Sequence, residues 1–323
     1  MSIKKLTSLP FGGPISALIA VICFSLNDMC IKYISGDYAL HQIVFFRSII
    51  GLGLLLGLLV PFSGGGLLSL GTQRLGLHLL RGLCVVFANL CFFLGLASLQ
   101  LSDGVAIFFI SPLLITVFSV IFLKETVGIH RWAAIFAGLV GVIVMLRPGS
   151  SAFQFASFLP LAAAFGYASL HMLTRYIGRT ESALTMSFYI QVTFFLVSCF
   201  FGVAIGGGQF AGNEDASLEF LLRAWVWPSL EDLPLFVLIG FVSAFGGFLI
   251  SYAYRNSEAG IIAPFEYFAM PLAVFWGYIV FAHWPDRISF LGMTLIVGAG
   301  LYLIWREIRA KAPSVQDTPR YRR

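Results

Sequence analysis

The stretch SPLLITVFSVIFLKETVGI (residues 111–129) decides the fold, because the chain contains a second version of it. A shift of 159 positions aligns it without a gap with MPLAVFWGYIVFAHWPDRI (residues 270–288), so that Pro112 meets Pro271. The two aligned stretches also share leucine, phenylalanine and isoleucine at matching positions. Beyond both stretches, a glycine and a terminal arginine match as well. The sequence therefore predicts two related halves.

Near the start of each half the best shift is 143, so the second half is longer. The extra residues fall in the polar segment 207–232, where an insertion costs little and where we expect a short interfacial piece. The predicted organisation is a first repeat over residues 14–149, a second repeat over residues 153–307 and a basic cytoplasmic tail over residues 308–323.

The composition indicates a protein whose solvent is lipid. Apolar residues make up 59% of the 323 and charged residues 11%, with a mean hydropathy of +0.92, whereas soluble domains carry about 25% charged residues. A span needs about 20 mostly apolar residues. Ten stretches qualify as transmembrane helices of an all-α integral membrane protein: 14–34, 41–60, 77–98, 101–123, 130–147, 155–177, 183–206, 233–254, 258–281 and 287–305.

The basic residues predict the orientation of these spans. With the N-terminus in the cytoplasm, 15 of the 20 lysines and arginines fall on the cytoplasmic side, leaving five (Lys32, Arg47, Arg147, Arg223 and Arg287) on the other side. Both termini are then cytoplasmic. Five spans in each half is an odd number, so equivalent helices run in opposite directions. Such inverted repeats around a central cavity are typical of secondary transporters.

The residues also resemble a known family. SDGVAIFFISPLLITVFSVIFLKETVGIHRWAAIFAGLVGVIVMLRPG (102–149) resembles the EamA domain of the drug/metabolite transporter superfamily, and the second half is similar to its partner domain. FSLNDMCIKYISGDYALHQIVFFRS (24–48) and HLLRGLCVVFANL (78–90) resemble a bacterial subgroup that includes S-adenosylmethionine and riboflavin uptake proteins. One departure is that Glu125, an acidic residue of the family pattern, has Trp284 as its counterpart in the second half.

The resemblance implies a transporter of the bacterial inner membrane that works by alternating access. Its substrate is expected to be an aromatic or nucleotide-like metabolite, with riboflavin considered first and S-adenosylmethionine second. An exporter of amino acids or drugs is the alternative. An intramembrane enzyme and a non-transporting sensor are the other classes, disfavoured because hydrolase motifs such as H-E-x-x-H and G-x-S-x-G and a sizeable soluble domain are missing from the sequence.

Asp28 is the first candidate for a site residue. A carboxylate inside a span costs about 2.5–3.5 kcal/mol on insertion scales, so it is expected to have a partner or a function. One interpretation is a structural ion pair with Lys32, four residues on. The other is a substrate or proton site, with Asn27 and Phe24 beside it. Lys32 lies near the span end, where it can reach water.

Glu266 is the second candidate, in APFEYFAMP between Pro264 and Pro271. Prolines in a span free backbone carbonyls, which is tolerated where the helix lines a cavity. Tyr267 is expected either to contact the substrate or to pack. Because a carboxylate removed from water holds its proton more readily, Asp28 and Glu266 are the proton-coupling candidates.

Further polar and aromatic residues complete the predicted substrate site. His171 takes the place of Asp28 under the shift of 143, and is expected to titrate or to bond a neighbouring helix. Asn89 lies in the middle of a predicted cavity-wall span. Phe108 and Tyr167 fall in spans that the family uses as cavity walls, although core packing is the default for any one ring. Arg47 and Arg81, near span ends, are expected to be interfacial anchors.

The remaining expectations concern partners. The five cysteines lie in apolar runs without the spacing of a zinc site, so neither a metal nor a cofactor is expected. The net positive charge is explained by the lysines and arginines that orient the spans, so no nucleic acid partner is expected. Small residues at helical spacing in spans five and ten, among them Gly141 and Gly300, predict a packing seam and suggest a homodimer through these helices.

Overall fold

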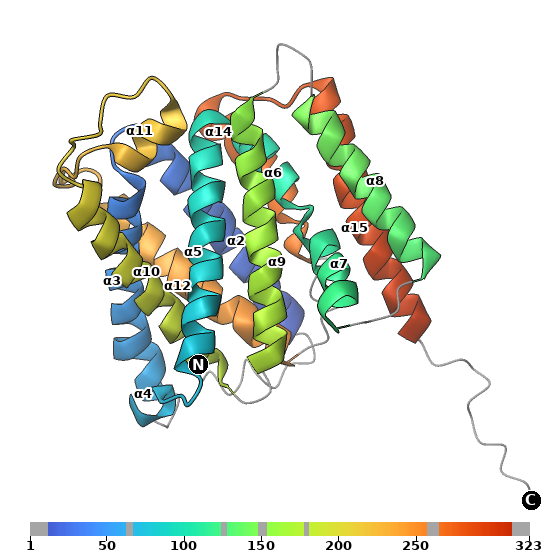
Figure 1. Cartoon of the computed structure of the whole chain (residues 1–323), viewed down its shortest axis with the longest axis horizontal. Helices are drawn as coiled ribbons and strands as arrows, with labels where there is room; N and C mark the ends of the chain where they lie inside the picture. Colours follow the sequence, from blue (N-terminus) through green and yellow to red (C-terminus); the bar gives the residue numbers. More distant parts are fainter. Residues whose placement is uncertain are drawn as a thin grey trace, which may run out of the picture.

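Helices make up almost all of the chain in the computed structural model, which describes residues 12–62, 67–123, 128–147, 154–177, 181–256 and 265–311 (Figure 1). The long helices are α2 (Gly12–Ile34), α3 (Leu40–Leu54), α5 (Leu75–Ser98), α6 (Leu101–Phe108), α7 (Ser111–Leu123), α8 (Ile129–Leu146), α9 (Phe158–Ile177), α10 (Ala183–Ile205), α12 (Leu233–Asn256), α14 (Ala269–Phe281) and α15 (Arg287–Lys311). Shorter elements are η1 (Leu55–Leu59), α4 (Val60–Phe62), η2 (Leu67–Leu70), η3 (Phe155–Ser157) and α11 (Ala216–Leu222).

The described helices confirm a multi-pass helical membrane protein. Seven helical stretches within the described ranges are long and apolar enough to cross a bilayer. Three shorter apolar helices, Trp132–Leu146, Ala269–Phe281 and Arg287–Tyr302, fall inside the predicted spans five, nine and ten. The count of ten spans stays a prediction. At the C-terminal end, α15 continues to Lys311, which lies within the predicted tail.

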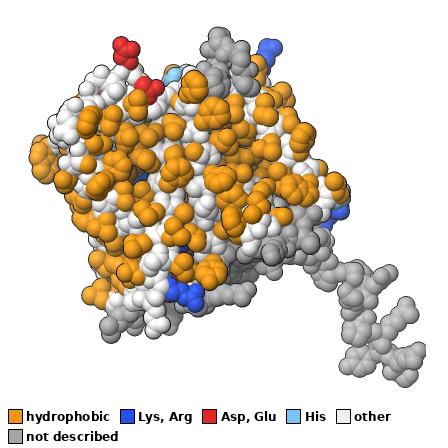
Figure 2. Space-filling view, viewed as in Figure 1, with side chains coloured by type: hydrophobic (Ala, Val, Ile, Leu, Met, Phe, Trp, Pro, Cys, Tyr) orange, Lys and Arg blue, Asp and Glu red, His pale blue; other side chains and the backbone are white. Residues whose placement is uncertain are grey.

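The outer surface fits a lipid environment. Figure 2 shows hydrophobic side chains spread over the middle of the visible face and charged side chains at the two ends of the helices. Large apolar side chains are strongly exposed, for example Val203 (91%), Phe136 (70%) and Phe200 (69%). Soluble monomers rarely expose contiguous apolar patches larger than a few hundred Å². The acyl chains of a bilayer are the solvent that such a surface requires.

The helices pack in pairs that join the two halves of the chain. α2 lies against α12, α5 lies against α9, and α8 lies against α15. α3 contacts both α10 and α12, while α10 also contacts α5. Figure 1 shows α8 and α15 side by side at one edge of the molecule. The halves are therefore interleaved, and the core includes residues of both, such as Ile31 of α2 and Ile239 of α12.

The small-residue seam of spans five and ten lies inside one chain. A Cβ atom added at Gly141 of α8 would lie 3.0 Å from the backbone oxygen of Gly292 on α15, and a Cβ at Gly292 would lie 2.3 Å from the Met145 side chain. Glycine lets the two backbones approach closely here. The predicted packing seam is thus occupied by the α8–α15 contact, and the homodimer stays a prediction.

The polar segment between α10 and α12 carries the short helix α11. The Asp215 side chain caps this helix by accepting a hydrogen bond from the Leu218 amide (2.9 Å). Phe220 is 1% exposed, and the Ser217 hydroxyl donates to the Leu94 carbonyl of α5 (2.7 Å). α11 therefore covers the C-terminal end of α5, slightly earlier in the sequence than the expected interfacial piece.

Candidate substrate site

The predicted spans four and nine each contain a turn, and the two turns differ by one residue under the 159-residue shift. The turn Phe109–Ile110 separates α6 from α7, and the turn Tyr267–Phe268 comes directly before α14. Pro112 and Pro271, which meet under the 159-residue shift, follow the two turns. Proline has no amide hydrogen to continue the helical ladder. Paired interruptions in the two halves of a transporter point to its substrate site.

The sequence had already indicated a loosened helix around Glu266, but not the break in span four. The signal for that break was present, because Pro112 matches Pro271 in the aligned stretches. Pro264, the second proline expected to flank Glu266, lies outside the described residues, as does Glu125.

A small cavity lies among α2, α6 and α14, next to the breaks. Its empty volume is about 190 Å³, whereas pockets for drug-sized ligands measure about 300–1,000 Å³. Because that volume includes open solvent, the cavity is too small for a ring metabolite in this conformation. Asp28 is the one ionisable side chain in the lining, which consists of Ser25, Asp28, Leu101, Val105, Ala269 and Ala273.

The structure excludes the ion pair between Asp28 and Lys32. The Lys32 ammonium instead donates to the carbonyl oxygens of Leu96 (2.5 Å) and Leu99 (2.7 Å) and lies 5.5 Å from the Phe281 ring centroid. Carbonyls in the last turn of a helix have no partner within it, and the helix dipole favours a cation there. Lys32 thus caps the C-terminal end of α5 and forms no ion pair with Asp28.

Arg47, expected to be an interfacial anchor, lies in the protein interior at 3% exposure. The expectation was wrong because Arg47, about two turns into α3, has partners on neighbouring helices that keep it inside the protein. Its Nη2 donates to Asn89 Oδ1 (3.1 Å), and the guanidinium lies 4.6 Å from the Phe194 ring centroid. Asn89 borders a second cavity, of about 400 Å³ empty volume, lined by residues of α3, α5, α10 and α11.

Asp28, Asn27, Arg47 and Asn89 form one polar group across α2, α3 and α5. The Asn27 amide nitrogen donates to Asp28 Oδ1 (3.1 Å), and the Arg47 charge acts electrostatically on the Asp28 carboxylate. Asn27 is 4% exposed. The sequence identified three of these four residues and missed Arg47, the cation of the group.

An aromatic group joins spans four, six and nine. The Tyr167 ring lies 5.2 Å from the Phe108 ring and 4.4 Å from the His171 ring, measured between centroids. The Glu266 carboxylate acts electrostatically on the Tyr167 hydroxyl. Tyr267 lies 5.2 Å from Phe109. The structure therefore brings Phe108, Tyr167 and His171 together near Glu266, and their role in binding a substrate stays a prediction.

Two predicted residues are mainly engaged in packing. The Phe24 ring lies against α12, where a Cβ added at Gly246 would be 3.2 Å away, and Phe24 is not part of the cavity lining. Tyr267 is 4% exposed, and its hydroxyl points at Gly300 of α15, where an added Cβ would lie 1.7 Å away. No hydrogen bond satisfies this hydroxyl among the described residues.

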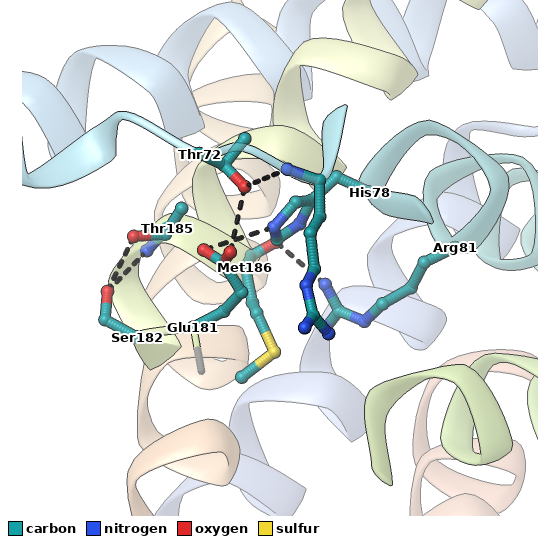
Figure 3. Close-up of polar contacts among 8 residues, drawn as sticks. Thr72, His78, Arg81, Glu181, Ser182, Thr185 and Met186 are labelled. Carbon is teal, nitrogen blue, oxygen red and sulfur yellow. Dashed lines mark hydrogen bonds and ion pairs between the residues drawn. The ribbon is translucent and has the colours of Figure 1, made fainter. Parts of the chain in front are cut away.

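A second polar cluster lies at the opposite, N-terminal end of α5 (Figure 3). Glu181, just before α10, accepts a hydrogen bond from the Thr72 hydroxyl (2.9 Å) and lies 3.4 Å from His78 Nε2. Arg81 donates to the Thr174 hydroxyl of α9 (2.7 Å) and to the Met186 carbonyl of α10 (3.1 Å).

These bonds bury Arg81 to 5% exposure, so its predicted role as an interfacial anchor was also wrong. The guanidinium finds acceptors in α9 and α10, which lets it remain inside the protein. The cluster ties α5 to α9 and α10 at this end. Within the described ranges, no three His, Cys, Asp or Glu side chains gather as a metal site would require.

Comparison with known proteins gives the same family that the sequence motifs suggested. Residues 11–147 match the EamA-like transporter family. A solved crystal structure superposes with a TM-score of 0.65 at 15% sequence identity, covering 93% of this chain and 99% of that one. At that identity the likeness shows the fold alone.

The curated relatives are bacterial transporters. The chain is 26% identical to the S-adenosylmethionine uptake transporter of Rickettsia prowazekii, over 90% of this chain and 91% of the relative. It is 27% identical to the riboflavin transporter of Vibrio cholerae, over 89% and 91%. It is also 25% identical to the pseudopaline exporter CntI of Pseudomonas aeruginosa, over 90% and 95%.

Proposed function

We propose that this chain, whose residues 11–147 match the EamA-like transporter family, is a secondary transporter of the drug/metabolite superfamily that takes up a small metabolite by alternating access. The observation that carries the proposal is the pair of helix breaks, at Phe109–Ile110 and Tyr267–Phe268, beside a cavity that contains Asp28. Broken helices near a midplane site are the means by which many secondary transporters hold their substrates.

The packing supports the division into two inverted repeats, 14–149 and 153–307. If spans one to five correspond to spans six to ten, the α2–α12 contact corresponds to the α9–α5 contact, and the α3–α12 contact corresponds to α10–α5. The contacts α8–α15 and α3–α10 each join a helix to its own counterpart. A two-fold exchange of the halves would produce this pattern, and it would allow one half to rock against the other.

The orientation proposal places the protein in the bacterial inner membrane with cytoplasmic termini. Figure 1 shows that α2 begins and α15 ends on the same side of the helix bundle, opposite α11. This arrangement supports an even number of spans. The distribution of basic residues supports the cytoplasm as the side of both ends.

The substrate proposal is an aromatic or nucleotide-like metabolite, because Phe108, Tyr167 and His171 offer ring faces near Glu266. The names of the relatives support S-adenosylmethionine and riboflavin as the compounds to test. Export is the second candidate for direction, and the similarity to a pseudopaline exporter favours it. Neither uptake nor export requires a covalent step.

The test is counterflow in proteoliposomes that contain the purified protein. Vesicles loaded with unlabelled compound are expected to accumulate the labelled compound transiently, for at least one member of a panel of vitamins, nucleosides and amino acids. Thermal stabilisation by the same compounds identifies ligands beforehand, because a ligand that binds the folded state raises its stability. Absence of counterflow with every stabilising compound contradicts the transporter proposal.

A further inference from the structure

The middle of α3 carries a buried cation that no carboxylate neutralises by contact. Arg47 is 3% exposed, and no Asp or Glu oxygen among the described residues lies within 4.0 Å of its guanidinium. One of its amino groups donates to Asn89, while its Nε has no acceptor in the part of the chain that the structure describes. An arginine inside a membrane protein is costly to maintain, and such residues commonly mark substrate pathways.

Asp28 carries the opposite charge on α2, at intermediate exposure. The amide of Asn27 provides the one hydrogen bond that the Asp28 carboxylate accepts within the described part of the chain, although a carboxylate has about four acceptor positions. No donor among the described residues reaches the oxygen of the Asn27 amide. Asp28 lines the cavity between α2, α6 and α14.

The two charges act on each other without forming an ion pair. Arg47 influences Asp28 electrostatically, yet the two groups are farther apart than the 4.0 Å of a salt bridge. A purely structural pair is expected to make direct contact, because only contact offsets the loss of water around both ions. An inorganic cation or anion would satisfy one of the two groups and leave the other as it is. A single molecule with both charges would satisfy both.

We infer that Asp28 and Arg47 are the two poles of a site for a zwitterionic metabolite, with the substrate ammonium at Asp28 and the substrate carboxylate at Arg47. The inference rests on the proposed function and names the substrate class of that transporter. A guanidinium matches a carboxylate in shape and charge, and Asn89 holds the guanidinium in place.

This charge arrangement reverses the order of the two substrate candidates. S-adenosylmethionine carries an amino-acid group with both charges and a purine ring for the aromatic group around Tyr167. Riboflavin has a flat ring system but neither an ammonium nor a carboxylate, so it leaves both poles unpaired. Burying a charge without its partner is unfavourable, and the site is therefore expected to reject neutral rings.

The experiment measures binding to the full-length protein in lipid nanodiscs by calorimetry. The probes are S-adenosylmethionine, its decarboxylated analogue and riboflavin. The wild type is expected to prefer S-adenosylmethionine over the decarboxylated analogue by more than about tenfold, since an unpaired buried charge is costly. In R47Q this preference is expected to fall to within about threefold, because the carboxylate loses its partner.

R81Q is the matched control, because Arg81 is buried to a similar extent (5%) and lies near the N-terminal end of α5. Its preference is expected to equal that of the wild type. The inference is overturned if the wild type binds both adenosyl compounds equally, or if R47Q weakens both by the same factor, as a structural role would. If R47Q does not fold, the same preference is measured with R47K, which retains the charge but lacks the planar fork that matches a carboxylate.

Counterflow with the same compounds separates this inference from the proposed function. Selective binding of S-adenosylmethionine without any counterflow contradicts transport and leaves the zwitterion site intact. Counterflow of riboflavin without any preference for the zwitterion contradicts the site and leaves transport intact.

Discussion

The rings of Phe109 and Tyr267 lie 5.2 Å apart, so the side chains at the two helix breaks touch each other. One residue belongs to the break in span four and the other to the break in span nine. The interrupted helices of the two halves therefore meet directly, next to the cavity that contains Asp28. A movement of either half has to change this contact.

Replacement of Gly300 by alanine is expected to destabilise the protein through Tyr267. The new methyl group would lie 1.7 Å from the Tyr267 hydroxyl, and overpacking of this kind costs about 1–3 kcal/mol. G298A is the matched control in the same helix, because a Cβ at Gly298 meets no atom within 4 Å. Unfolding midpoints in denaturant measure both changes.

A double-mutant cycle with Y267L identifies the cause of that loss. The effects of G300A and Y267L are expected to be non-additive by about 1 kcal/mol or more, because the two residues share one contact. Simple additivity would mean that Gly300 is required for a reason other than Tyr267.

The two intramembrane acids are expected to control transport and its pH dependence. D28N and E266Q should each reduce uptake by about tenfold or more, since hydrogen bonds to charged groups contribute about 1.5–3 kcal/mol. The variant that removes the coupling proton should also flatten the pH profile of uptake. E219Q is the control, because Glu219 lies in α11, away from both acids in the sequence. Normal uptake and an unchanged pH profile in both variants would eliminate both assignments.

The Arg147–Asp286 ion pair predicts a stability change at low pH. Hydrogen bonds from Arg147 and from the Ser289 amide lower the pKa of Asp286 from 3.8 to about 2. The stabilisation is therefore present above pH 3.8 and is lost as the pH falls toward 2. Asp286 is half exposed (52%), so the effect is small and screened by salt.

R147Q tests this prediction with little change in backbone strain. Arg147 has a left-handed backbone (φ 47°), and glutamine bears the same penalty there. The difference in melting temperature between wild type and R147Q is expected to shrink as the pH is lowered from 5 to 2. A difference that stays constant over this range would show that the pair contributes no pH-dependent stability.

Glu181 is expected to hold the N-terminal end of α5 in place (Figure 3). E181A leaves the Thr72 hydroxyl without its acceptor and removes the carboxylate that lies 3.4 Å from the buried His78 ring, which costs about 1–3 kcal/mol. E181Q should cost less, because its amide oxygen still accepts from Thr72. Denaturant unfolding checks the order of the variants, and equal stability of E181A and E181Q would contradict this role.

The sequence predicted the helices well and the positions of individual charges less well. Long apolar runs define the spans, because the bilayer requires them. For Lys32 the sequence left open an ion pair with Asp28 and a side chain that reaches water; its actual acceptors, the carbonyls of Leu96 and Leu99, depend on a tertiary contact that no local pattern reveals. Arg47 was missed because its partners, Asn89 of α5 and the Phe194 ring of α10, lie on other helices that the local sequence does not reveal.

The size of the cavity could not be predicted from the sequence. A transporter exchanges between conformations whose free energies differ by a few kcal/mol. Residue patterns indicate which side chains line the substrate path but not whether the path is open. Pro112 and Pro271 mark the breaks in the sequence, whereas the closure around Asp28 is a property of one conformation.

The most direct measurement is counterflow of labelled S-adenosylmethionine in proteoliposomes containing wild-type protein or D28N. We predict transient accumulation above the equilibrium level with the wild type and its loss with D28N. Wild-type vesicles that bind the compound yet never accumulate it, or D28N vesicles that accumulate it as fast as the wild type, would contradict a transport site at Asp28.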